Sequence, residues 1–295
     1  MKPGVKGKIH FSRRDFLKLT GRVAGLSLIA GLGGWKYISQ IEPGDLELVE
    51  LSLALPRLNP VFSGFKIAAI SDIHIGGWMT FERLTPVVDM VLAQEPDLVL
   101  LLGDFMHGYG WDDEKQACAD SLAKELLRLS ERTTTLAVMG NHDYWTSAPD
   151  VRRALENANV IELSNATYSL TRDSSQLHFC GVDDIWEGQD DLDEILAQLP
   201  AEGSAILMAH EPDFADTSAA TGRFDLQISG HTHGGQVVIP GYGPPVRPPF
   251  GEKYISGLYK VGEMWQYTNR GVGTGRIPVR FNCRPEVTVF TLITA

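Results

Sequence analysis

Five short polar clusters contain residue types that can bind metal ions and transfer protons. They are Asp72-Ile73-His74, Gly103-Asp104, Gly140-Asn141-His142-Asp143, His210-Glu211 and Gly230-His231-Thr232-His233. Five of the eight histidines lie in these clusters. Carboxylate, amide and imidazole groups without a thiolate suit Mn, Fe or Zn better than Ca or Mg alone. In the last cluster, the glycine lets the backbone approach closely, so both histidines can point to one site.

Each cluster directly follows an apolar run that predicts a β-strand, at residues 65–71, 98–102, 134–139, 205–209 and 226–229. The carboxyl ends of parallel strands line one rim of a sheet, so clusters far apart in the sequence can converge. One such cluster alone is more often a turn, a helix cap or a solvated histidine. The prediction of a metal centre therefore depends on all five occurring together and in this order.

The ordered clusters resemble the signature blocks of the calcineurin-like metallophosphoesterase family over about residues 65–235. The resemblance implies an α/β fold, a four-layer α/β/β/α sandwich of two mixed sheets with flanking helices. It also implies a centre that holds two divalent metal ions. One ion would be bound by Asp72, His74, Asp104 and His233, and the other by Asp104, Asn141, His210 and His231. Asp104 would then bridge the two ions.

The activity implied by this resemblance is hydrolysis of phosphoesters by a hydroxide that bridges the two ions. His142 resembles the catalytic histidine of the family, which stabilises or protonates the leaving oxygen. Asp143 would orient His142, although Asp143 and Glu211 equally fit partners of the ligand histidines or plain surface acids. We expect a phosphodiesterase acting on small or lipid-linked substrates. The rival class is a noncatalytic metal-binding scaffold, which the intact ligand set and His142 disfavour.

The C-terminal third contains arginines among glycines and prolines. Arg270 and Arg276 are candidates for binding a second phosphate or a headgroup, and arginines solvated at a β-rich edge fit equally well. The segment between them suggests a dinucleotide loop, but Ile-Pro-Val follows it instead of a helix, which excludes that interpretation. This third also resembles a bacterial membrane-associated branch of the family, some members of which are UDP-diacylglucosamine pyrophosphatases. His107 departs from that branch, in which an acid is common at this position.

Hydrophobic periodicity predicts the elements that position the clusters. Helices are expected over residues 81–92, 122–129, 149–157 and 192–199. Further strands are expected over residues 166–170, 177–182, 236–239, 265–269 and 286–292. No linker or repeat interrupts the chain after Pro43-Gly44-Asp45, so residues 46–295 are predicted to form one domain.

The N-terminal 45 residues are predicted to be a targeting segment followed by a short linker. Residues 12–18 read Ser-Arg-Arg-Asp-Phe-Leu-Lys and precede a weakly apolar, Gly-rich stretch, which resembles a twin-arginine export signal. The apolar stretch is shorter than the ~20 residues that a transmembrane helix needs. Cleavage and retention as a membrane anchor both remain open. We expect export by the twin-arginine machinery to the periplasm or to the outer face of the cytoplasmic membrane.

The charge distribution bears on the class of substrate. The net charge of the chain is −11, but residues 1–40 carry eight Lys/Arg and one acid, which leaves −18 for the remainder. A domain with this negative charge repels a polyanion, which disfavours nucleic acid as a substrate. A small phosphorylated substrate fits this charge better.

Overall fold

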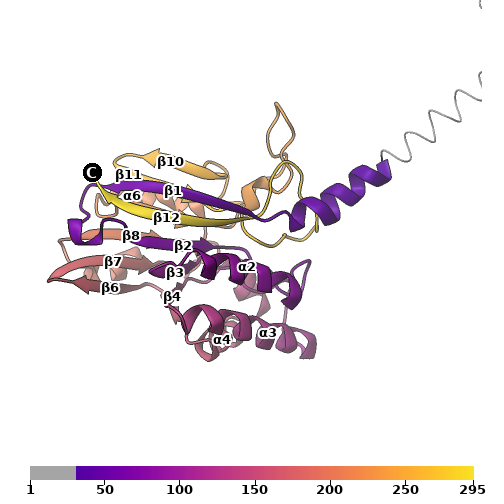
Figure 1. Ribbon diagram of the computed structural model, residues 1–295, viewed down its shortest axis with the longest axis horizontal. Helices are drawn as coiled ribbons and strands as arrows, with labels where there is room; N and C mark the ends of the chain where they lie inside the picture. The colour runs from indigo at the N-terminus through magenta and orange to yellow at the C-terminus, as the bar shows by residue number, and fades with distance from the viewer. Residues whose placement is uncertain (1–30) are drawn as a thin grey trace, which may run out of the picture.

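The computed structural model describes residues 31–295 as two six-stranded mixed sheets packed face to face, with helices on the outer faces (Figure 1). This arrangement confirms the four-layer α/β/β/α sandwich expected from the sequence. The chain passes first through one sheet and then through the other, before its last strand returns to the first sheet.

The first sheet has the strand order β1-β12-β2-β3-β4-β5. Its strands are β1 (Glu47–Leu55), β2 (Lys66–Ile70), β3 (Leu98–Leu101), β4 (Thr134–Ala137), β5 (Ile161–Glu162) and β12 (Glu286–Thr294). The run from β2 to β5 is parallel, and β12 pairs antiparallel with β2. Three helices connect the parallel strands, namely α2 (Phe81–Ala93), α3 (Asp113–Ser130) and α4 (Asn141–Asn157).

The second sheet has the strand order β10-β11-β9-β8-β7-β6. Its strands are β6 (Ala166–Arg172), β7 (Ser175–Gly181), β8 (Ser204–Met208), β9 (Leu226–Ser229), β10 (Gly257–Val261) and β11 (Met264–Thr268). The strands β7, β8, β9 and β11 are parallel, and both edge strands are antiparallel to their neighbours. The outer face packs against α5 (Leu192–Gln198) and α6 (Ala215–Ala220) through an apolar cluster that includes Ile195 and Ala215.

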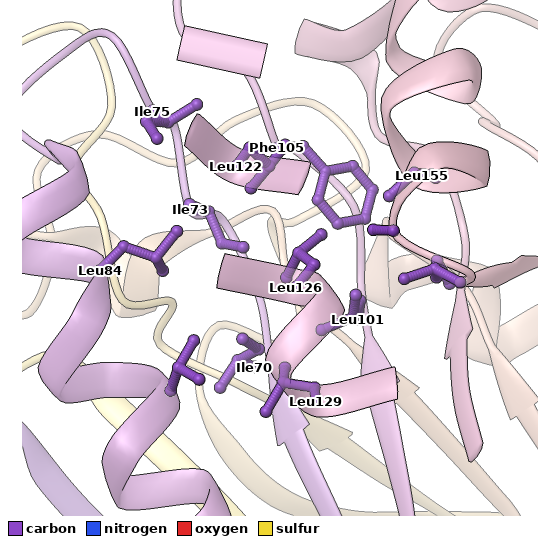
Figure 2. Packing of buried hydrophobic residues seen from close by; sticks show 14 of the residues in the cluster. Ile70, Ile73, Ile75, Leu84, Leu101, Phe105, Leu122, Leu126, Leu129 and Leu155 are labelled. Atoms are coloured by element: carbon purple, nitrogen blue, oxygen red, sulfur yellow. The ribbon is translucent and has the colours of Figure 1, made fainter. Parts of the chain in front are cut away.

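Two apolar layers enclose the first sheet. Alternate residues of β2 face opposite sides, so Ile67 packs between the sheets while Ile70 packs under the helices. Figure 2 shows the layer between the first sheet and its helices, in which Leu84 of α2 and Leu126 of α3 lie over the sheet. Strands buried on both faces have nearly continuous apolar sequences, which is why β2, β3 and β4 could be predicted.

The strand predicted over residues 236–239 is wrong. Gly234, Gly235 and Gln236 have φ angles of 62°, 79° and 55°, and these left-handed conformations are incompatible with an extended strand. Only isolated bridges form there, between Val237 and Phe281 and between Ile239 and Gly243. The segment is therefore a loop.

Pro149 lies inside α4, but Ser147 breaks the helical geometry there with φ −177° and ψ 97°. The proline thus occupies the first turn of a second helical segment, as predicted. Short helical turns complete the secondary structure: η1 (Tyr37–Ile41), η2 (Glu42–Gly44), η3 (Pro60–Phe62), η4 (Pro212–Phe214) and η5 (His233–Gly235).

The described chain begins in a helix over residues 31–41 that extends away from the sandwich (Figure 1). Arg13 and Arg14, the pair that predicts the export signal, lie outside the described residues. From residue 31 onward, no helix combines the length and the hydrophobicity needed to cross a bilayer.

Candidate metal centre

The five polar clusters meet where the two sheets present the carboxyl ends of their parallel strands. Clusters follow β2, β3 and β4 in the first sheet and β8 and β9 in the second. Two hydrogen bonds join the sheets at this point. The His231 N–H donates to Asp72 Oδ2 at 3.0 Å, and His210 Nδ1 donates to the Leu102 carbonyl at 2.6 Å. The convergence predicted from the sequence is therefore present.

Asp72, His74 and His233 form the first group of possible metal ligands. The Nε2 atoms of His74 and His233 lie 3.0 Å apart, and Asp72 Oδ1 lies 3.4 Å from His233 Nε2. All three side chains are buried. Burial lowers the pKa of His74 to about 3, so its imidazole is neutral near pH 7. A neutral imidazole has the lone pair that a metal ligand requires.

Asp104 lies between His74 and His210, which belong to different predicted ligand groups. Its Oδ2 is 3.3 Å from His74 Nε2 and also 3.3 Å from His210 Nε2. The other oxygen accepts the backbone N–H of His142 at 2.9 Å. The bond from His210 Nδ1 to Leu102 fixes the tautomer of His210 and leaves Nε2 facing Asp104. One carboxylate oxygen is thus shared by ligands of both predicted groups.

The remaining predicted ligands are Asn141 and His231. Asn141 Oδ1 and His210 Nε2 are buried and have no hydrogen-bond partner among the described residues. Buried polar atoms without partners are costly, and an ion at this place would satisfy both of them. His231 Nε2 donates to the Pro249 carbonyl at 2.9 Å, so its Nδ1 is left as the ligand atom. The residues present therefore fit a centre that holds divalent ions.

The backbone around the centre adopts left-handed conformations at five of the seven predicted ligands. The φ angles are 52° at Asp72, 48° at His74, 56° at Asp104, 72° at His231 and 51° at His233. Such angles cost free energy in residues other than glycine and persist only where the surrounding structure enforces them. They occur within four residues of the ends of β2, β3 and β9.

Gly230 provides the space for the turn after β9. A Cβ atom there would lie 1.7 Å from Ser71 Oγ and 2.6 Å from Asp72 Oδ2. We expect Gly230→Ala to displace Asp72 and to lower metal occupancy and activity about 10- to 100-fold, although no ligand is replaced. Metal analysis of the purified variant measures this effect. Gly34→Ala is the control, because no atom lies within 4 Å of its added methyl group. Unchanged metal content in Gly230→Ala would contradict the prediction.

His142 lies at the edge of the centre and is half-buried. Its ring centroid is 4.6 Å from that of His74 and 4.7 Å from that of Trp145. The ring atom Nδ1 has no hydrogen-bond partner within residues 31–295. The imidazole therefore lies beside the predicted ligands, with one ring nitrogen within 4.8 Å of the possible ligand atoms of His74 and Asp104.

Asp143 does not orient His142, contrary to the prediction. Its carboxylate accepts the N–H groups of Phe105 and Met106 at 2.8 and 3.1 Å and that of Gly140 at 3.0 Å. These bonds connect the loop after β3 to the start of α4, so Asp143 fixes the positions of Asp104 and Asn141. Its full burial excludes the alternative of a plain surface acid.

Glu211 is also fully buried, so it is not a surface acid either. Its carboxylate accepts the N–H groups of Ile185 and Trp186 at 3.3 and 3.4 Å. This contact holds the loop that carries Trp186 against the strand end that carries His210.

The two arginines predicted to bind substrate have different surroundings. The Arg270 guanidinium pairs with Glu286 and, at 2.7 Å, with Glu47, so it is engaged within the protein. Arg276 instead lines a cavity of about 460 Å³ that also contains Asp104, His142 and His233. The structure thus places Arg276, but not Arg270, beside the metal centre.

Two tryptophans that were not predicted from the sequence also line this cavity, Trp145 and Trp186. Trp145 follows Asn141 by four residues on α4, and that helical spacing was a usable signal. The Trp186 N–H donates to Glu211, and its ring packs against Trp145 and His231. These contacts have no local signature in the sequence.

Arg280 was also missed as part of the site. Its buried guanidinium donates to the carbonyls of Arg270, Gly271 and Gly273, and Gly273 N–H in turn donates to the Asp72 carbonyl at 2.9 Å. Arg280 therefore supports the loop that packs against Asp72.

Comparison with known proteins agrees with this geometry. The family model for calcineurin-like phosphoesterases matches residues 65–235. The chain belongs to this family. YkuE, a metallophosphoesterase of Bacillus subtilis, is 36% identical over 95% of this chain and 97% of its own. Phosphodiesterase YaeI of Escherichia coli is 32% identical over 96% of this chain and 99% of its own. A bovine transmembrane protein with a metallophosphoesterase domain is 33% identical over 86% of this chain and 58% of its own.

The match to the calcineurin-like phosphoesterases spans all five clusters. It begins at β2, which precedes Asp72, and ends just after His233. The chain is thus a metallophosphoesterase, a hydrolase of a family that uses divalent metal ions. The family match does not include the two loops at residues 236–251 and 271–285, which carry much of the cavity wall, including Arg276.

Proposed function

We propose that this metallophosphoesterase is a binuclear phosphodiesterase that acts on small or lipid-linked phosphoesters. The observation that carries the proposal is the position of Asp104 Oδ2, 3.3 Å from a nitrogen of each predicted ligand group. A carboxylate shared in this way suits two adjacent ions better than one. The name of the E. coli relative, a phosphodiesterase covered over nearly its whole length, supports diester specificity.

Mn, Fe and Zn are the ions that fit the donor set, since imidazole, carboxylate and amide ligands occur without thiolate. Two such ions would polarise the phosphate and lower the pKa of a water molecule enough to make it a nucleophile near neutral pH. Two residues of the chain would act directly on the substrate. His142 donates a hydrogen bond or a proton to the leaving oxygen, and Arg276 binds a second negative charge of the substrate.

The lining of the cavity supports a substrate with an apolar part. Four predicted metal ligands and His142 line the cavity, and Val237, Val246, Ile277 and Val279 line it as well. A phosphoester with a hydrocarbon or aromatic group could therefore place its phosphate on the ligands and its apolar group along these apolar side chains.

The proposal can be tested by stripping the purified protein with a chelator and reloading it with Mn, Fe or Zn. Hydrolysis of bis-p-nitrophenyl phosphate, p-nitrophenyl phosphate and UDP-diacylglucosamine is then compared. We expect the diester to be cleaved with a higher kcat/KM than the monoester. Faster monoester cleavage would contradict diester specificity, and preference for the UDP-lipid would favour a pyrophosphatase. If no metal supported hydrolysis, the result would favour the alternative of a noncatalytic metal-binding scaffold.

We also propose that the protein is exported by the twin-arginine route and acts outside the cytoplasm. The basis is the Arg13-Arg14 pair and the weakly apolar stretch after it. Because a receptor reads the arginine pair itself, we expect Arg13→Lys with Arg14→Lys to retain the protein in the cytoplasm. Cell fractionation measures this. Unchanged export of the double variant would mean that another route is used.

A further inference from the structure

Exposed apolar side chains are concentrated in a small part of the molecule. Within residues 31–295, 14 large hydrophobic side chains are exposed, and ten of them lie in residues 32–41, 239–250 and 277–281. Val246 and Tyr242 are 74% and 73% exposed, and Ile277 is 62% exposed. Scattered single exposures are normal on a soluble surface, but a contiguous group indicates an interaction site.

Hydrogen bonds join the three segments to one another. Val238 N–H donates to the Phe281 carbonyl at 2.8 Å, and Arg280 N–H donates to the Ile38 carbonyl at 2.7 Å. Figure 1 shows the long loop, in orange, and the N-terminal helix, in indigo, projecting at the same end of the sandwich. The exposed apolar residues of the two loops are here called the apolar rim. Its members are Ile239, Tyr242, Val246, Phe250, Ile277 and Phe281.

The charge of the apolar rim differs from that of the body. Residues 236–251 and 271–285 contain no Asp or Glu, whereas the chain after residue 40 has a net charge of −18. Arg247 and Arg276 lie in these loops and are exposed. The rim thus combines apolar side chains with positive charge, the pair of properties that favours binding to an anionic lipid surface.

The apolar rim lies at the mouth of the active-site cavity. Val246 and Ile277 line the same cavity as Asp104 and His142. We propose that the apolar rim docks onto an anionic lipid surface, so that the cavity opens at the level of the lipid headgroups. Docking of this kind needs no membrane-spanning helix, because the loops enter only the interfacial region. The proposal concerns the folded body and does not depend on catalytic activity or on the N-terminal segment.

Hydrogen–deuterium exchange of the full-length protein with vesicles tests the proposal directly. The vesicles contain either phosphatidylcholine alone or phosphatidylcholine with phosphatidylglycerol. We expect the anionic vesicles to slow exchange in residues 239–250 and 277–281 several-fold, while β6 and β7 exchange as they do in solution. Attachment through the N-terminal segment alone would sediment the protein with vesicles but leave exchange in both loops unchanged, and that result would overturn the proposal.

A matched set of variants adds a second test. Tyr242→Ser, Val246→Ser and Ile277→Ser together remove three exposed side chains of the apolar rim. We expect roughly tenfold or greater weakening of vesicle binding and loss of the loop protection, since each side chain contributes buried apolar area. The control is Ile161→Ser with Ile293→Ser, which are 41% and 38% exposed but lie outside the rim. Equal binding by the triple variant and the control would contradict docking through the rim. Slower hydrogen–deuterium exchange in the apolar rim with a partner protein, but not with vesicles, would also contradict docking onto lipid.

Discussion

Asp104→Asn is expected to release both metal ions and to lower activity by at least about 100-fold. One oxygen of Asp104 lies 3.3 Å from His74 and from His210, which belong to different predicted ligand groups. Replacing residues that only support metal ligands already costs about 10- to 100-fold, so loss of the shared carboxylate should cost at least as much. The amide keeps the size of the side chain and removes its charge, so the effect can be assigned to ligation.

Metal content per chain and turnover of a diester substrate measure this outcome. Asp120→Asn is the control, because Asp120 is exposed on α3 and its carboxylate bonds only to Gln116 among the described residues. The control should retain both metals and full turnover. Two metals per chain with normal turnover in Asp104→Asn would exclude a bridging role.

His142→Ala is expected to keep the metals and lose activity. The side chain is not among the predicted ligands, yet its ring lies 4.6 Å from that of His74 with Nδ1 buried and unpaired within the described chain. Removing a donor aimed at charge that develops in the transition state costs about 10²- to 10³-fold in kcat. We expect that loss with metal content unchanged.

The leaving group distinguishes the two possible roles of His142. A general acid matters most for alkoxides, which need a proton, and least for p-nitrophenolate, which does not. A deficit that grows with the pKa of the leaving group would identify protonation, while an equal deficit for all esters would indicate electrostatic stabilisation. Full activity of the metal-loaded variant would exclude His142 from the mechanism.

The convergence of the five clusters could be predicted because its signals in the sequence are local. Each cluster follows a strand that is buried on both faces, and parallel strand ends converge by the rules of sheet topology. The edge strands β1 and β10 were missed, since half-exposed residues give them weaker patterns. The ion pairs of Arg270 were also unpredictable, because Glu47 lies 223 residues away in the sequence. Neither partner of such a pair has a local signal.

The distribution of the ligands over both sheets has a consequence for the order of folding. Asp72 and His231 are separated by 159 residues, yet a hydrogen bond joins them. Contacts of such high sequence separation close large loops and form late, after the local helices and strands. Neither sheet alone carries a complete ligand set, so a folding intermediate with one sheet formed should bind metal weakly. Tight metal uptake would then report that the whole sandwich has assembled.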